Sequence, residues 1–204
     1  MKKILSGLLI SGVLFGGITS VYATDIDGED SASIVVNGTL GQDNTDEDGP
    51  NIDEGSNDWI NVTLDTENIF YTTKASDHKT ITSPDYTITN NSGRAVKVSA
   101  KSFTVDSGNL NNVDALDIKG VDTSTTEKTV NLKSFTAGDF LVLANNQGKL
   151  DVEGDAADTY IKETTYKYFG TTKDDYYKST GEKTTHTLTL EFEALGKDGT
   201  PVAP

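Results

Sequence analysis

Short runs in which apolar and polar residues alternate make up most of the chain beyond residue 57, and turn-forming residues separate these runs. The clearest run is 186–194, in which Thr and Glu occupy every second position. Its apolar face is formed by His186, Leu188, Leu190, Phe192 and Ala194. Because successive side chains of a strand point to opposite faces, this pattern predicts a β-strand with one side buried. A shorter run, 58–65, carries Ile60, Val62 and Leu64 on its apolar face.

Two alternating runs flank the turn-rich stretch 90–94, whose sequence is Asn-Asn-Ser-Gly-Arg. The run before it contains Tyr86 and Ile88, and the run after it is 96–100. Asn and Gly tolerate the positive φ of tight β-turns, so the whole stretch predicts a β-hairpin. The apolar positions change parity after residue 100, which predicts a bulge or a strand end near Ser102.

The other strand candidates are short, and no window of helical length keeps apolar residues at helical spacing without interruption. These candidates are Ser33–Leu40, 69–71, 115–119, 129–135, 140–144 and 159–169. Roughly eight to ten short strands separated by turn signals predict an all-β protein with a single antiparallel β-sandwich.

Residues 1–23 have the layout of a secretory signal peptide. Two lysines precede an apolar run, Ile4–Val21, and the small residue Ala23 ends the segment. We expect cleavage between Ala23 and Thr24, which makes the mature chain an exported protein. The alternative is an uncleaved membrane anchor, because the apolar run is close to the lower limit of about 17 residues for a spanning helix.

Beyond the signal peptide we expect one domain, with an N-terminal strand and a long acidic loop at 24–57 and the sandwich body at 58–204. The formal charge is −15, and removal of the two lysines of the signal peptide takes it to −17. So acidic a chain argues against a nucleic-acid partner. The chain has no Cys, which excludes disulfides and thiolate metal sites. Residues 196–204 show neither an apolar tail nor a basic stop, so we expect non-covalent attachment and no membrane insertion after cleavage.

The acidic loop contains a candidate Ca²⁺ site. Asn44, Asp46, Asp48 and Gly49 fall on the spacing that opens an EF-hand loop, and oxygen ligands clustered on a flexible loop are what Ca²⁺ requires. The closing glutamate of that pattern is displaced by one place, to Glu54. The alternative is a solvated acidic loop that keeps the domain soluble. No other cofactor is expected.

A second candidate site is a group of tyrosines between residues 160 and 177. Exposed tyrosine rings stack on sugars or anchor protein interfaces. The candidates for such ligand binding are Tyr166, Tyr168, Tyr176 and Tyr177. The alternative is that Tyr takes the place of Leu and Ile in a β core, because Tyr is favoured in strands.

No group of residues indicates catalysis. Ser76 and Lys79 fit the Ser-x-x-Lys pattern of penicillin-recognising acyl enzymes, but the accompanying Lys-Thr-Gly motif is absent. His186 lies at the end of an apolar face, which favours a packing role over that of a base. We therefore expect a protein that is not an enzyme.

The order of these features resembles that of secreted surface proteins of low-GC Gram-positive bacteria, in particular the WxL-like type. The stretches that carry the resemblance are Val36–Leu40, Trp59-Ile60-Asn61-Val62-Thr63-Leu64, Ser83–Gly93 and Leu188–Phe192. Proteins of this type attach non-covalently to peptidoglycan through a β-rich domain that carries Trp-x-Leu motifs. In this chain Trp59-Ile60-Asn61 and Leu190-Glu191-Phe192 stand where those motifs would lie, and neither is complete.

We therefore expect an exported, adhesin-like binding protein of the bacterial surface or wall, whose partner is a cell-wall polymer or a surface protein or glycan. Two alternatives remain. In the first, strand 33–40 pairs with the open edge of a neighbouring copy and builds a fibre, so that the chain is a homo-oligomer. In the second, the protein is a Ca²⁺-dependent carbohydrate-binding module that uses the acidic loop and the tyrosines.

Overall fold

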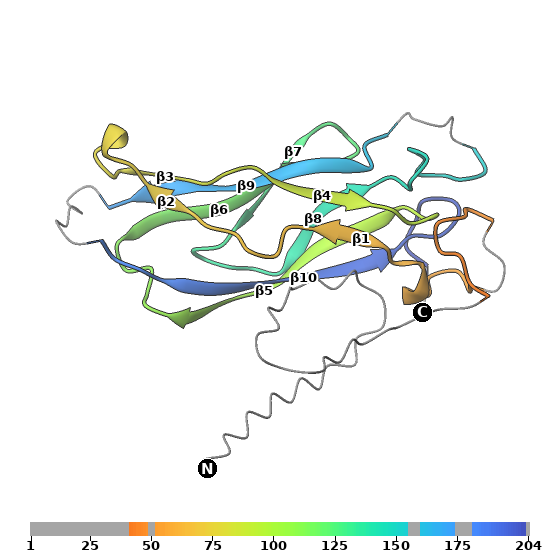
Figure 1. Ribbon diagram of the computed structural model, residues 1–204, viewed down its shortest axis with the longest axis horizontal. Helices are drawn as coiled ribbons and strands as arrows, with labels where there is room; N and C mark the ends of the chain where they lie inside the picture. The colour runs from red at the N-terminus through yellow and green to blue at the C-terminus, as the bar shows by residue number, and fades with distance from the viewer. Residues whose placement is uncertain (1–40, 49–51, 155–159, 174–180, 203–204) are drawn as a thin grey trace, which may run out of the picture.

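The computed structural model describes residues 41–48, 52–154, 160–173 and 181–202, and the regular structure in them is almost entirely β (Figure 1). Two single-turn 3₁₀ helices accompany the strands, η1 (Asn57–Trp59) and η2 (Lys74–Ser76). The strands are β1 (Val62–Leu64), β2 (Tyr71–Thr72), β3 (Thr80–Thr82), β4 (Tyr86–Asn90), β5 (Val96–Ser107), β6 (Val113–Val121), β7 (Glu127–Asn131), β8 (Gly138–Leu143), β9 (Glu163–Thr172) and β10 (Thr185–Ala194). Two antiparallel sheets pack together, which confirms the predicted all-β sandwich.

The larger sheet is built around β9, which is long enough to take two partners on one of its edges. β4 pairs with the first half of β9 and β3 with the second half, while β6 runs along the other edge. β1 extends the sheet beyond β4, β2 extends it beyond β3, and β7 extends it beyond β6. One edge of this sheet therefore consists of β1 and β2 and the opposite edge of β7.

The pairing of β6 with β9 depends on a glycine. The register shifts between Val113 and Ala115, which marks a bulge or irregularity in β6. A Cβ atom at Gly170 of β9 would lie 2.0 Å from the carbonyl oxygen of Ala115. Real Cβ atoms do not approach so closely, so only glycine lets the two strands meet at this point.

The smaller sheet has the order β10-β5-β8. β10 pairs with β5 along its whole length, and the alternation predicted for 186–194 is present. Leu190 lies opposite Ala100 and Thr189 lies opposite Ser102, so the register skips Lys101. This irregularity confirms the bulge predicted near Ser102.

The core lies between the two sheets. On one side of the sandwich β8 packs against β6 and β7. On the other side the β1–β2 edge faces β10 across a groove described below. The fully buried side chains of the core include Ile81, Ile88, Val96, Val98, Leu116, Ile118, Leu141 and Leu143.

The predicted hairpin between β4 and β5 is wrong. β4 ends at Asn90 in the larger sheet and β5 begins at Val96 in the smaller sheet, so the connection crosses between the sheets. Nδ2 of Asn90 donates hydrogen bonds of 2.8 Å to the carbonyl oxygens of Arg94 and Ala144. Oγ of Ser92 accepts from the backbone N–H of Arg94. The polar residues that indicated a tight turn instead satisfy buried backbone groups at one end of the sandwich.

Arg94 ties the described part of the acidic loop to this end. Its side chain is 2 % exposed, its guanidinium lies over the ring of Trp59, and its Nη2 forms an ion pair with Glu54. Nη1 donates to the carbonyl oxygen of Glu47. Trp59 is fully buried, so the lone tryptophan has a structural role.

Several strand predictions differ from the structure at their boundaries, among them 129–135 and 159–169, where the strands are β7 (Glu127–Asn131) and β9 (Glu163–Thr172). The pattern over 58–65 predicts one strand, but its first part is the end of η1, where Trp59 turns inward, and only Val62–Leu64 is strand. The apolar stretch 69–71 contributes only Tyr71 to a strand. The predicted signal peptide (1–23) and the predicted strand Ser33–Leu40 lie outside the described residues.

Candidate functional site

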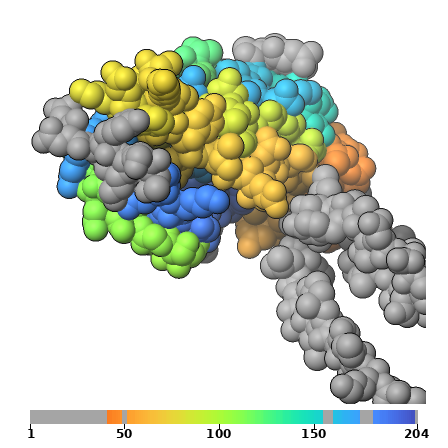
Figure 2. All heavy atoms as spheres, turned by 60° about the vertical axis from the view of Figure 1, so that its left-hand side comes forward, coloured from red at the N-terminus to blue at the C-terminus, as the bar shows by residue number. Residues whose placement is uncertain are grey.

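A groove with a volume of about 1250 Å³ opens along the side of the sandwich where β10 faces the β1–β2 edge. One wall is β10 together with residues 181–184, which precede it, and the other wall is the segment 65–72. We call the cavity the β10 groove and residues 65–72 the wall segment. In Figure 2 the orange and yellow residues that follow β1 lie above the blue residues of β10.

The apolar face of β10 is incompletely covered. Leu188, Leu190 and Phe192 line the groove and are only partly buried. Val96 and Val98 on the neighbouring strand β5 are fully buried. The inner face of β10 therefore retains apolar surface that water can reach, which is a common property of binding grooves.

β10 also has an edge that no described strand occupies. It pairs with β5 on one side, and among the described residues it is the last strand of its sheet. The edge strand is ten residues long. Such an edge presents N–H and C=O groups that can pair with another extended chain.

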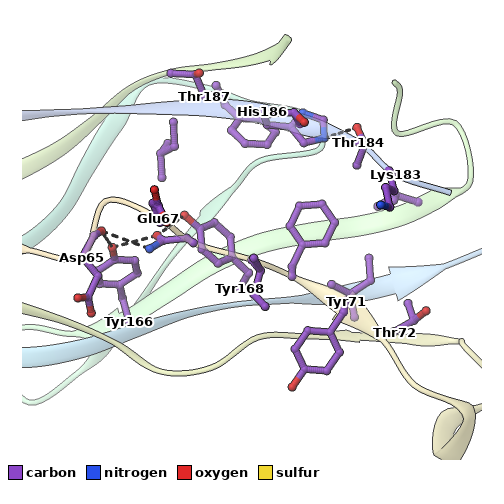
Figure 3. Close-up of a pocket in the computed structure, with 18 of the residues that line it drawn as sticks. Asp65, Glu67, Tyr71, Thr72, Tyr166, Tyr168, Lys183, Thr184, His186 and Thr187 are labelled. Atoms are coloured by element: carbon purple, nitrogen blue, oxygen red, sulfur yellow. Dashed lines mark hydrogen bonds between the residues drawn. The ribbon is translucent and has the colours of Figure 1, made fainter. Parts of the chain in front are cut away.

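Three tyrosine hydroxyls fasten the wall segment to the larger sheet, and Figure 3 shows two of these tyrosines, Tyr166 and Tyr168. The hydroxyl of Tyr86 accepts from the N–H of Ile69 at 2.6 Å and donates to its carbonyl oxygen at 3.0 Å. The hydroxyls of Tyr166 and Tyr168 each lie 3.0 Å from Oδ1 of Asn68. These contacts attach the wall segment to the larger sheet, on the side of the groove opposite β10.

The lip of the groove is formed by two exposed apolar side chains. Ile69 is 61 % exposed and Tyr71 is 44 % exposed, although both belong to the wall segment. Their exposure means that substitutions there change the groove without removing core packing.

A row of rings crosses the groove floor from one sheet to the other. Tyr168 and Phe70 have ring centroids 6.3 Å apart, and Phe70 lies 6.0 Å from His186. His186 in turn stacks on Phe103, with centroids 5.0 Å apart and an interplanar angle of 18°. Such ring pairs stabilise a core beyond their apolar burial.

His186 is held in this row as a neutral ring. Its Nε2 lies 2.8 Å from Oγ1 of Thr184. Its Nδ1 is buried without a hydrogen-bond partner among the described residues. Burial lowers the pKa of His186, and the charge of Asp106 opposes that shift only in part. These contacts agree with the packing role that its position in the sequence favours.

Tyr166 and Tyr168 stay protonated at neutral pH. Burial raises the pKa of Tyr166 to about 12, while the hydrogen bond with Asn68 acts in the opposite direction. Burial also raises the pKa of Tyr168. Both hydroxyls therefore remain available as hydrogen-bond donors to the wall segment.

The structure places the predicted tyrosine site partly in the core. Tyr166 and Tyr168 are 3 % and 7 % exposed, which matches the core-packing alternative rather than an exposed stacking platform. They nevertheless line the groove floor, so their role in ligand binding stays a prediction. Tyr176 and Tyr177 lie outside the described residues.

The predicted Ca²⁺ ligands take part in contacts within the protein. Asn44 donates through Nδ2 to the carbonyl oxygen of Asp58 and accepts at Oδ1 from Asn61. Oδ1 of Asp46 accepts from the backbone N–H of Asp48. In the described part of the chain no three His, Asp or Glu side chains gather as a metal site. Residues 49–51 of the predicted site lie outside that part.

Sequence reasoning missed the wall segment. Asn68 and Ile69 shape the groove, but they lie between strands and follow no periodic pattern. The alternating pattern of 186–194 gave a partial indication. Its apolar face must pack against another part of the chain, and β5 cannot provide that packing because it lies beside β10 in the same sheet.

In the part of the chain that the structure describes, no helix is both long and apolar enough to cross a membrane. A comparison with known proteins finds no family model and no curated protein that matches this chain.

Proposed function

We propose that this protein is an exported, non-catalytic binding protein of the bacterial surface or wall, and that it binds a surface polypeptide through the β10 groove. The ligand in this proposal is an extended, uncharged segment. The observation that carries the proposal is the combination of a ten-residue strand edge that no described strand occupies with a partly exposed apolar face on the same strand.

An extended polypeptide fits this combination better than a glycan does. A strand edge offers repeated backbone donors and acceptors, which an added strand satisfies along its whole length. The apolar side chains of β10 then receive every second side chain of the ligand. A sugar would leave many of these groups unpaired.

The charges around the groove favour an uncharged or weakly basic ligand. Asp65, Glu67 and Glu182 line it, against the single cation Lys183 among the described lining residues. The whole chain is strongly acidic as well. An acidic segment would therefore be repelled, whereas a neutral strand is tolerated.

The proposal of export rests on the pattern of residues 1–23, with a basic start, an apolar run and a small residue at its end. Non-covalent binding through the groove would then retain the mature chain at the surface.

The first test is fractionation of the host culture into medium, wall and membrane, with intact mass measurement of the recovered protein. We expect wall-bound protein that begins at Thr24. Full-length protein in the membrane fraction, or recovery from the medium alone, would contradict the proposal.

The second test addresses the groove. Purified chain from Thr24 onward is incubated with isolated walls, and sedimentation is compared for Ile69→Ser and Val105→Ser. Both residues are exposed, but only Ile69 lines the groove. We expect binding to fall at least tenfold for Ile69→Ser alone and to vanish when the walls are first stripped with protease. Equal binding by both variants, or full binding to stripped walls, would reject a polypeptide ligand in this groove.

A further inference from the structure

The segment Ser33–Leu40 has the chemistry that the β10 groove accepts. Its sequence, Ser-Ile-Val-Val-Asn-Gly-Thr-Leu, carries no charge, although acidic residues surround it on both sides. Ile34, Val36 and Leu40 alternate with Val35, Asn37 and Thr39, so one face of the extended segment is apolar.

On this basis, and resting on the proposed function, we propose that the β10 groove receives Ser33–Leu40 from a second copy of the chain. The segment then adds a fourth strand to the β10-β5-β8 sheet. Its length agrees with the edge that it occupies, since eight residues span about 26 Å and the ten residues of β10 span roughly 33 Å.

The attachment of the segment to its own body argues for donation to a neighbour. Asn44 is fixed at the end of the sandwich where β10 ends, because its carbonyl oxygen accepts from the N–H of Gly93. A segment that ran from this end into its own groove would lie parallel to β10. All eight strand pairs between described residues are antiparallel. Parallel pairs are also slightly less stable per residue.

Gly41 directly follows this segment and occupies an open position. Gly41 has a φ of +84° and is exposed, and no atom lies within 4 Å of the position that its Cβ would take. A positive φ of this kind is readily adopted by glycine, so the backbone can change direction at this position. The preceding segment can point toward a neighbouring molecule.

Matching the apolar faces sets the register. If the segment is centred on β10 and runs antiparallel to it, Ile34 lies beside Phe192 and Val36 lies beside Leu190. Leu40 then lies beside His186. A shift by one residue would turn the apolar side chains of the segment to solvent, so only shifts by two residues are alternatives.

This orientation places the donor's body beyond the Thr185 end of the acceptor. Each copy then gives a strand at one end and receives a strand along its side. Such a head-to-tail contact leaves one strand to donate and one groove to fill in each added copy, and we propose that it repeats into an open, linear fibre rather than a closed ring.

Assembly is tested with the chain from Thr24 onward, by light scattering after size exclusion and by electron microscopy over a range of concentrations. The variants are Val36→Asp, on the inner face, and Asn37→Asp, which adds the same charge on the outer face. We expect fibres from the unchanged chain and from Asn37→Asp, and monomers from Val36→Asp. Monomers from the unchanged chain at all concentrations, or equal assembly by both variants, would overturn the inference.

The position of the donated segment beside β10 is tested by disulfide cross-linking. The chain has no cysteine of its own, so introduced cysteines can pair only with each other. In the register above Asn37 lies opposite Thr189, so Asn37→Cys and Thr189→Cys chains are mixed and mildly oxidised. We expect a mixed disulfide between two chains, and its loss when Val36→Asp is added to the donor. A disulfide within one monomer of the double variant would show that the segment occupies its own groove, which overturns the inference.

A peptide of residues 33–40 provides a measurement that does not depend on fibre formation. Added to the Val36→Asp chain, it should slow amide hydrogen exchange in β10 at least tenfold, while a peptide with Asp at the Val36 position should not. Unchanged exchange with both peptides would overturn the inference. Failure of the peptide test with wall binding intact overturns this inference and leaves the proposed function standing. Absence of wall binding with assembly intact rejects the wall ligand of the proposed function and leaves the second copy as the occupant of the groove.

Discussion

The guanidinium carbon of Arg94 lies 4.0 Å from the centre of the Trp59 ring, and Nη2 of the same residue lies 2.6 Å from Oε1 of Glu54. One buried cation thus joins the start of β5 to two residues of the segment that precedes β1. This contact, rather than an apolar core alone, closes the end of the sandwich from which the acidic loop departs.

Replacing Arg94 with Met should lower the free energy of unfolding by about 2 to 4 kcal/mol. The substitution removes the stacked cation and leaves the carbonyl oxygens of Glu47 and Gly93 without this donor. The control is Lys101→Met, which removes an exposed ion pair with Glu191 and should cost less than about 1 kcal/mol. Urea unfolding measures both, and equal losses would contradict a structural role for the Arg94 cluster.

Gly170→Ala should destabilise the protein by at least about 2 kcal/mol, because the new methyl group would collide with the backbone of β6. Gly138→Ala, also in a strand, is the matched control, since no atom lies within 4 Å of the position of its Cβ. We expect the control to be neutral or slightly stabilising. Thermal unfolding of the two variants checks the difference, and similar melting temperatures would refute the bulge geometry.

The protein should lose stability between pH 10 and pH 12. In the unfolded chain Tyr166 ionises near its ordinary pKa of 10, whereas burial raises its pKa to about 12 in the folded chain. The folded state therefore binds more protons in this interval, and its stability falls as the pH rises, by about 2 kcal/mol for this one residue. Unfolding free energies at pH 9 to 11.5 should show a shallower fall for Tyr166→Phe.

Stability should also fall as the pH drops from 7 to 5, in part through His186. Burial lowers the pKa of this histidine in the folded chain, so the unfolded chain binds the extra proton first, below about pH 6.5. His186→Phe preserves the ring stack and should reduce this loss. A proton titration by nuclear magnetic resonance checks the cause directly. A midpoint for His186 at or above 6.5 would contradict the burial argument.

The sequence predicts the structure best where the feature depends on the side-chain pattern of a single strand. The alternation of Leu188, Leu190 and Phe192 predicts β10 and its inner face, and the parity change after Ala100 predicts the bulge beside it. Both features depend only on which way neighbouring side chains point along one strand. That information is local, so one sequence contains it.

The crossover at Asn90–Arg94 could not be predicted in the same way. Asn, Ser and Gly favour tight turns exposed to water, and the same residues satisfy buried backbone groups between two sheets. Which of these occurs depends on the partners Ala144 and Glu54, which are distant in sequence. The groove could not be predicted either, because its second wall also depends on contacts between residues distant in sequence. These are the contacts between Asn68 and the tyrosines of β9.

The attachment of the wall segment has a consequence for the range of ligands that the groove admits. Ile69 and Asn68 are fastened to the larger sheet by tyrosine hydroxyls rather than by a strand ladder. Each such bond contributes only about 1 kcal/mol net, so residues 66–70 of the wall segment can move outward without breaking the pairing of β1 with β4 or of β2 with β3. We therefore expect the groove to adjust its width on the side of the wall segment while β10 stays in place, so that ligand side chains of different size fit in the same register.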